Sequence, residues 1–126
     1  MRLYTITDLV NESYQIASDH GFWQDYAEYG QQDYDGIPQT YMFSTKLALI
    51  HSEVSEALEE LRDPLVDLTK TRYTETGKPE GFGPELADIV IRVADLAAAA
   101  GIDLEAVIIE KQAYNRGRPF KHGKTM

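Results

Sequence analysis

Two long stretches of the chain carry apolar residues at the three- and four-residue spacing of an amphipathic α-helix. Because a helix turns by about 100° per residue, this spacing places the aliphatic side chains of each stretch on one face. The aliphatic positions are Leu47, Ile50, Val54, Leu58 and Leu61 in the first stretch, and Leu86, Ile89, Val93, Leu96 and Ala100 in the second. We expect these two faces to be core.

Start and stop signals extend the pattern to four helices. The predicted helices cover residues 7–20, 40–62, 84–100 and 104–115. Gly21 and Gly101 follow predicted helix ends, Pro64 forbids continuation of the second helix, and Asp103 is a suitable N-cap for the fourth. Segments rich in Gly, Pro and polar residues separate the helices, and no convincing strand alternation is present. The pattern predicts an all-α protein, a four-helix bundle.

Composition limits the class of protein. The chain has 126 residues, 43% of them hydrophobic and 26% charged, which is typical of one globular domain covering residues 1–126. No apolar run approaches the length of a membrane span and the N-terminus lacks the apolar region of a signal peptide, so we expect a cytoplasmic protein without membrane contact. Without cysteine, and with three scattered histidines, any metal would be bound by oxygen atoms.

The charge of the chain is unevenly distributed. The net charge of −9 argues against bulk nucleic-acid binding, which needs a basic surface. From Lys111 onward, however, there are five basic residues and no acidic one, and residues 116–126 form a basic C-terminal tail. Such a chain could bind a small polyanion, through bridging cations on its acidic body and directly through its tail.

Acidic pairs follow the margin of both aliphatic faces. Glu53 and Glu56 are three residues apart in the second helix, and Glu85 and Asp88 are three residues apart in the third. If the two helices pack antiparallel, the pairs can converge, and four carboxylates would repel one another unless protonated or neutralised by cations. Mg²⁺ is the natural candidate because it prefers oxygen ligands and is usually bound through a few carboxylates, waters and substrate phosphates.

The alternative to a metal site is that these acidic residues form an ordinary solvated helix surface. A lone Glu-x-x-Glu is common on exposed helices, but two such pairs beside core faces favour a metal site. Arg92 is expected to form an ion pair with Asp95, one turn away. Lys46 lies on the acidic stripe of the second helix, where phosphate contact and neutralisation of Glu53 or Glu56 remain alternatives.

The acid spacing resembles the signature of the MazG-like superfamily of all-α nucleoside triphosphate pyrophosphohydrolases. Its pattern is Glu-x-x-Glu, a spacer, and Glu-x-x-Asp, which here are "EVSE" (Glu53, Glu56), 28 intervening residues, and "ELAD" (Glu85, Asp88). The stretch from "KPEGFGPELAD" through "EKQAYNRGRPFKHGK" is similar to the C-terminal half of that family. The resemblance covers residues 40–124 well and the first helix only in general terms.

The resemblance implies a function. It implies hydrolysis between the α and β phosphates of a nucleotide, which would remove noncanonical or surplus deoxynucleotides. It also implies Mg²⁺, or Mn²⁺ in its place, held by Glu53, Glu56, Glu85 and Asp88. Glu56 is the preferred general base, and a homodimer or homotetramer is expected. The alternatives are a catalytically idle helical module and a hydrolase of another pyrophosphate-linked compound, such as a histidine-pathway intermediate.

Candidate substrate-binding residues lie on both sides of the acidic pairs. Lys111 and Asn115 are one helical turn apart and so lie on one face of the fourth helix. Lys111 could contact a phosphate, and Asn115 could form a hydrogen bond with a sugar or with the edge of a base. Arg118 could bind two phosphate oxygens through its fork of donors. In related enzymes acting on pyrimidine deoxynucleotides, aromatic residues at the position of Phe22 and Trp23 stack on the base. The alternatives are a solvated tail and, for Trp23, a plug at the end of the bundle.

Overall fold

The computed structural model describes residues 2–24 and 37–119. Its elements in chain order are α1 (Ile6–Asp19), α3 (Ile37–Glu60), β1 (Arg72–Tyr73), β2 (Pro79–Glu80), α4 (Phe82–Ala99) and α5 (Leu104–Arg116). Apart from one small hairpin, the regular structure of these ranges is helical, and the predicted all-α class is confirmed. Residues 120–126 of the predicted basic tail lie outside the described residues. None of the described helices is long and apolar enough to cross a membrane.

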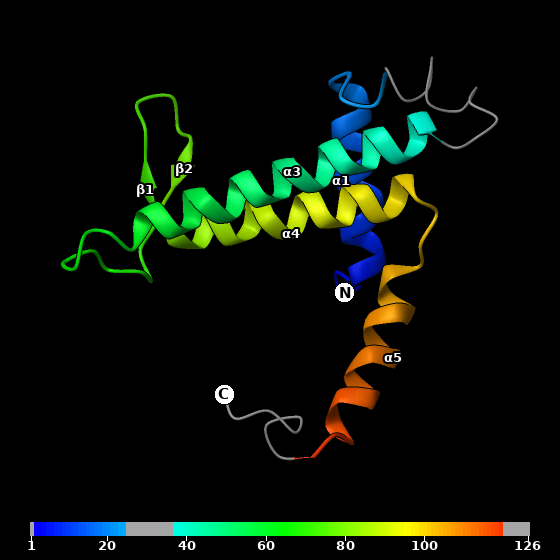
Figure 1. The fold of residues 1–126 in the computed structure, drawn as a ribbon. Helices are drawn as coiled ribbons and strands as arrows, with labels where there is room; N and C mark the ends of the chain where they lie inside the picture. The colour runs from blue at the N-terminus through cyan, green and yellow to red at the C-terminus, as the bar shows by residue number, and fades with distance from the viewer. Residues whose placement is uncertain (1, 25–36, 120–126) are drawn as a thin grey trace.

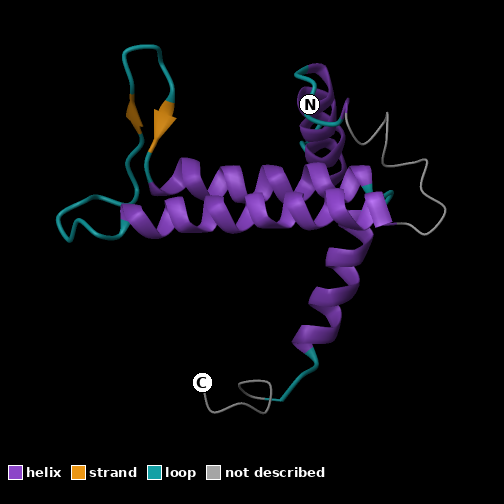
Figure 2. Cartoon of the chain, turned by 45° about the horizontal axis from the view of Figure 1, so that its top comes forward, coloured by secondary structure: helices purple, strands orange, loops and turns teal. Residues whose placement is uncertain are grey.

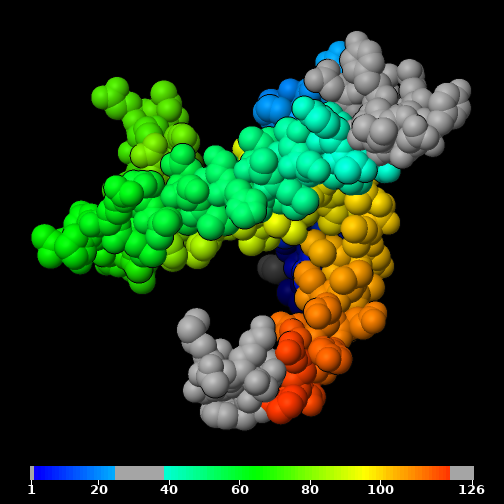
Figure 3. Space-filling model, viewed as in Figure 1, coloured from blue at the N-terminus to red at the C-terminus, as the bar shows by residue number. Residues whose placement is uncertain are grey.

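Two antiparallel helices form the centre of the structure. The helices α3 and α4 lie side by side along most of their lengths, and α1 crosses them near one end (Figure 1, Figure 2). From that same end α5 extends away from the pair as a separate arm, which the space-filling view makes plain (Figure 3). One side of the α3/α4 pair is thus covered in part by α1, and α5 leaves the long surface of α3 uncovered.

Local signals in the sequence explain where the outer helices begin and end. The hydroxyl of Thr5 accepts a hydrogen bond from the Asp8 amide at 3.1 Å, and the Asp8 carboxylate accepts one from the Thr5 amide at 2.8 Å, which forms a capping box for α1. Gly21 and Gly101 follow α1 and α4 with φ of 82° and 71°. The Asp103 carboxylate accepts from the Ala106 amide at 3.1 Å. The predicted signals at Gly21, Gly101 and Asp103 are confirmed.

The inner helices begin earlier than predicted. The helix α3 starts at Ile37, not at residue 40, and α4 starts at Phe82, so Pro38 and Pro84 lie in first turns. Proline is compatible with these positions because first-turn amides have no acceptor within the helix. The predicted connector at 63–84 also contains a hairpin, in which Arg72 pairs with Glu80 and Tyr73 with Pro79. Two residues per strand are too few for an alternating pattern to be recognised.

The hairpin is attached closely to both central helices. Arg72 forms an ion pair with Glu60 near the end of α3, with an Nη2 to Oε1 distance of 3.0 Å. Gly81, directly before α4, has φ of 136°, and a Cβ there would lie 3.0 Å from the Lys70 carbonyl oxygen. This position therefore requires glycine, because the backbone conformation disfavours other residues and the approach leaves no room for a side chain.

The packing of the central pair corrects the predicted core faces. The buried apolar residues of the described chain are Val10, Trp23, Ala57, Ala94 and Ala97. By contrast, Leu47 is 52% exposed and Leu58 is 61% exposed. The other exposed residues of the two predicted core faces are Val54, Leu86, Val93 and, directly after α3, Leu61. Small residues occupy the contacts between helices, so six of the ten predicted core residues lie exposed, whereas Glu53 and Glu85 of the acidic pairs are only partly exposed.

Candidate metal centre and adjoining pocket

Three of the four predicted metal-binding acids lie together. Glu53 of α3 and Glu85 and Asp88 of α4 each offer a carboxylate oxygen, and these three oxygens lie within 4.8 Å of one another. The antiparallel packing of α3 against α4 brings the pairs together although 28 residues separate them in the chain. Glu56 is exposed on α3. We call Glu53, Glu85 and Asp88 the acidic cluster.

Two carboxyl groups of the acidic cluster, those of Glu85 and Asp88, have pKa values above the ordinary range. Burial raises the pKa of Glu85, and the charges of Asp88, Glu53, Glu56 and Glu60 raise it further. Burial and the Glu53 charge raise the pKa of Asp88, against which Arg92 and Lys78 act. Both shifts reflect the energy of placing negative charges close together with reduced access to water. A bound cation would remove that energy, and three carboxylate oxygens are a donor set that fits a hard divalent ion.

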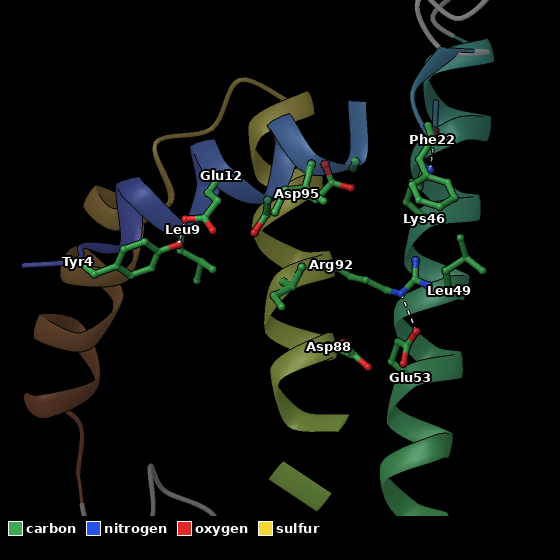
Figure 4. A pocket seen from close by; sticks show the side chains of 14 residues that line it. Tyr4, Leu9, Glu12, Phe22, Lys46, Leu49, Glu53, Asp88, Arg92 and Asp95 are labelled. Carbon is green, nitrogen blue, oxygen red and sulfur yellow. Dashed lines mark hydrogen bonds and ion pairs between the residues drawn. The ribbon is translucent and has the colours of Figure 1, made fainter. Parts of the chain in front are cut away.

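The single ion pair described for the acidic cluster joins Glu53 of α3 to Arg92 of α4. Nε of Arg92 donates to Oε1 of Glu53 at 2.8 Å, joining α4 to α3 (Figure 4). The sequence predicted Asp95 as the partner of Arg92, one turn along the same helix. Because α3 presents Glu53 to α4, the arginine reaches across the helix contact instead. Asp95 has a different hydrogen-bond donor.

A pocket of about 590 Å³ adjoins the acidic cluster between α1 and the central pair (Figure 4). Its volume is in the range of small-molecule sites. Its lining includes apolar side chains from α1, α3 and α4 together with charged groups of both signs. The lining residues are Tyr4, Leu9, Glu12, Ser13, Ile16, Ala17, Phe22, Lys46, Leu49, Glu53, Asp88, Ile91, Arg92 and Asp95. Glu53 and Asp88 thus belong both to the acidic cluster and to the pocket wall.

The two aromatic candidates after α1 differ in their surroundings. Phe22 is 64% exposed and lines the pocket, whereas Trp23 is only 3% exposed and does not. The indole Nε1 of Trp23 donates to Oδ1 of Asp95 at 2.6 Å, and the Lys46 ammonium lies 4.4 Å from the indole ring centroid. Lys46 also donates to the Phe22 carbonyl oxygen at 3.0 Å. This arrangement favours the packing interpretation of Trp23, so that of these two aromatic residues Phe22 has the ring available to a ligand.

Asp95 is the partly buried acid at the α1 end of the pocket. Burial raises its pKa, while the Trp23 hydrogen bond and the charges of Lys46 and Arg92 lower it. The carboxylate therefore anchors the Trp23 indole, and with it the segment after α1, onto α4.

The basic candidates near the C-terminus lie apart from the acidic cluster. Lys111 and Asn115 belong to α5, and Arg118 follows it, on the arm that extends away from α3 and α4 (Figure 1). Within that arm the Lys111 ammonium and the Arg118 guanidinium lie 5.4 and 5.7 Å from the ring centroid of Tyr114. The structure of one chain does not bring these three residues to the acidic cluster.

Sequence reasoning missed part of the pocket. The Tyr4 hydroxyl donates to Oε2 of Glu12 at 2.9 Å, and both residues line the pocket. A signal was present, because Glu12 interrupts the apolar stripe of Leu9 and Ile16 at helical spacing. Its meaning depends on how α1 crosses the central pair, which periodicity does not reveal.

The chain was compared with family models, curated proteins and solved structures, and none of them matches it.

Proposed function

We propose that this protein is a Mg²⁺-dependent nucleotide pyrophosphohydrolase of the all-α, MazG-like type. One observation carries the proposal: Glu53, Glu85 and Asp88 present oxygen atoms within 4.8 Å of one another, and two of them, Glu53 and Asp88, also line a pocket of about 590 Å³. A divalent ion at these acids could share ligands with a polyphosphate whose nucleoside occupies the pocket. The cytoplasm, where nucleotides are abundant, is the proposed location.

In the proposed reaction, different acidic residues would bind the metal ion and accept the proton of the attacking water. Glu53, Glu85 and Asp88 would hold Mg²⁺, with Mn²⁺ as a substitute. The ion, when bound, neutralises phosphate charge and favours deprotonation of water. Glu56, exposed beside the acidic cluster, would accept the proton of the attacking water. The water oxygen forms a bond to one phosphorus of the α–β bridge, and the bridging oxygen leaves with the electron pair of its broken bond. The products are a nucleoside monophosphate and pyrophosphate.

The pocket supports the assignment of the nucleoside. Phe22 offers an exposed ring to stack on a base, and Lys46 places a positive charge at the same end of the pocket. Aromatic stacking on a base contributes about 1 to 3 kcal/mol and tolerates different bases.

A panel assay tests the function directly. Purified protein is incubated with ribo- and deoxynucleoside triphosphates and Mg²⁺, and pyrophosphate, orthophosphate and monophosphate are measured separately. We expect equal amounts of monophosphate and pyrophosphate, and no product when Mg²⁺ is chelated. Release of orthophosphate alone would contradict the proposed bond cleavage. Nucleotide binding without any product would favour an idle module, and turnover confined to other pyrophosphate-linked compounds would change the substrate class.

We further propose that two copies of the chain associate through the exposed aliphatic face of α3 and α4. Leu47, Leu58 and Val93 belong to this face, and an antiparallel helix pair that meets its own copy can form a four-helix core. The α5 arm leaves one end of the pair, so it could reach the acidic cluster of a second copy and bring Lys111, Asn115 and Arg118 to the phosphates. Mixing inactive Glu53→Gln protein with inactive Lys111→Ala protein would then restore activity.

A further inference from the structure

Arg92 stands between the acidic cluster and the rest of the pocket. Asp88, Arg92 and Asp95 follow one another on successive turns of α4, the first in the cluster and the last beside Trp23. Figure 4 shows the Arg92 side chain reaching from α4 toward Glu53 of α3, between Asp88 and Asp95. Arg92 also lines the pocket. A ligand that extends from the acidic cluster toward α1 would therefore pass this guanidinium.

The ion pair with Glu53 uses only part of the guanidinium. Within residues 2–24 and 37–119, the hydrogen bond of Arg92 is the one from Nε to Glu53 at 2.8 Å. A guanidinium carries four further N–H groups on its two terminal nitrogens. The Arg92 side chain is 42% exposed, compared with 17% for Glu53. The carboxylate is thus held in place while the terminal nitrogens of the arginine remain accessible from the pocket.

We propose that Arg92 has two roles: its Nε positions Glu53 in the acidic cluster, and its terminal nitrogens bind the α-phosphate of the nucleotide. This inference rests on the proposed function, because that function places the polyphosphate at the acidic cluster and the nucleoside in the pocket. The α-phosphate joins these two parts, and its place is therefore beside Arg92. Arginine suits such a place because its fork of donors matches two phosphate oxygens.

The substitution Arg92→Lys distinguishes the two proposed roles of Arg92 from the effect of its positive charge alone. Arg92→Lys retains a positive charge, but a single ammonium cannot bind Glu53 through one nitrogen and a phosphate through two others. Arg92→Gln removes the charge as well. Arg62→Gln is a matched control, because Arg62 is an exposed arginine paired with Glu59 in the turn after α3 and does not line the pocket.

The test compares deoxynucleoside monophosphates with the corresponding deoxynucleosides by calorimetry in the presence of Mg²⁺. We expect Arg92→Lys and Arg92→Gln to weaken monophosphate binding by about tenfold or more, as loss of a charge-assisted hydrogen bond does. Nucleoside binding should stay unchanged, and Arg62→Gln should bind both ligands as the wild type does. Thermal denaturation with Mg²⁺ verifies that each variant is folded.

The outcomes separate this inference from the function on which it rests. Absence of pyrophosphate release by the wild type, with a selective loss of monophosphate binding in the Arg92 variants, would refute the hydrolase and support the phosphate contact. Normal hydrolysis with unchanged monophosphate binding in both variants would overturn the inference. So would equal weakening of monophosphate and nucleoside binding, which would indicate that Arg92 only maintains the pocket. A Mg²⁺ titration without nucleotide should show weaker binding in Arg92→Lys, which keeps the positive charge near the acidic cluster but loses the Nε contact that positions Glu53. Unchanged or tighter Mg²⁺ binding in Arg92→Lys would overturn that role.

Discussion

Individual carboxylates decide how this protein responds to cations. Glu85 and Asp88 have raised pKa values because they are partly removed from water and face other negative charges. Arg92 is paired with Glu53, but its one positive charge is opposed by three clustered acids. The carboxylates of the acidic cluster therefore repel one another. Protons or a metal ion would reduce this repulsion, and the resulting change in stability should be measurable.

Removing one ligand acid should abolish hydrolysis without unfolding the protein. Glu53→Gln or Asp88→Asn should reduce pyrophosphate release by more than about a hundredfold, since even supporting residues of a metal site contribute factors of ten to a hundred. Because Asp88 has a raised pKa and forms no described ion pair, the loss of its negative charge in Asp88→Asn should leave stability in metal-free buffer equal or higher. Steady-state kinetics and thermal denaturation measure both effects. Glu59→Gln, in an exposed ion pair of α3, is the control, and full activity of either cluster variant would remove that acid from the metal site.

Without metal, the folded protein should become more stable as the pH is lowered toward the carboxyl pKa values, because two of those values are raised in the folded state. The folded state of Glu85 and Asp88 binds protons more tightly than the unfolded chain, so stability is lost as pH rises from the unperturbed carboxyl values through the folded ones. We expect the free energy of unfolding to increase as pH is lowered from 7 toward about 5. Urea denaturation at a series of pH values checks this. Glu85→Gln should weaken the dependence, and a wild-type protein that only loses stability over this range would refute the explanation.

At the scale of elements, the helix boundaries are determined largely by neighbouring residues in the sequence, whereas the connections between helices depend on contacts with distant residues. The N-caps Thr5 and Asp103 begin α1 and α5, and Gly21 and Gly101, both with positive φ, follow the ends of α1 and α4. The hairpin of β1 and β2 is held in place by contacts with other elements, among them the ion pair of Arg72 with Glu60 at the end of α3. It brings the chain back to the point where α4 begins, three residues before Glu85.

Gly81 should be the most sensitive glycine of this connection. Gly81→Ala places a Cβ 3.0 Å from the Lys70 carbonyl oxygen in a backbone region that only glycine tolerates well, so we expect a loss of about 1 to 3 kcal/mol in stability. Gly83→Ala is the control, because its Cβ would meet nothing within 4 Å and alanine favours the helix. Chemical denaturation measures both variants. Equal stability of the two would show that the close approach at Gly81 is easily relieved.

The whole molecule exposes more aliphatic surface than its small core accounts for. Six of the ten side chains that periodicity assigns to a core are exposed on or beside α3 and α4, while α1 covers only part of the pair. Burial of such side chains stabilises association by roughly 25 cal/mol for each square ångström removed from water. A second copy offers the same face, which is the basis of the proposed dimer.

Leu58 should control this association. Leu58→Glu places a charge in the aliphatic face, so we expect a shift from dimer to monomer, measured by light scattering coupled to size-exclusion chromatography. Leu65→Glu is the matched control, because Leu65 is 91% exposed in the segment between α3 and β1. If both variants have the wild-type mass, the aliphatic face is not the contact surface. If the wild type is itself a monomer, the proposed dimer is refuted.

The helical class, most helix ends and the pairing of acids at i and i+3 follow from the sequence alone, because each depends on residues within one or two turns of each other. The tertiary structure alone decided which side of α3 and α4 turns inward, how α1 closes the pocket, and that Arg92 pairs with Glu53, 39 residues away, and not with Asp95. Periodicity defines a face but not the partner of that face. The choice among partners is made by contacts between segments distant in the chain, where small residues allow helices to approach and large ones keep them apart.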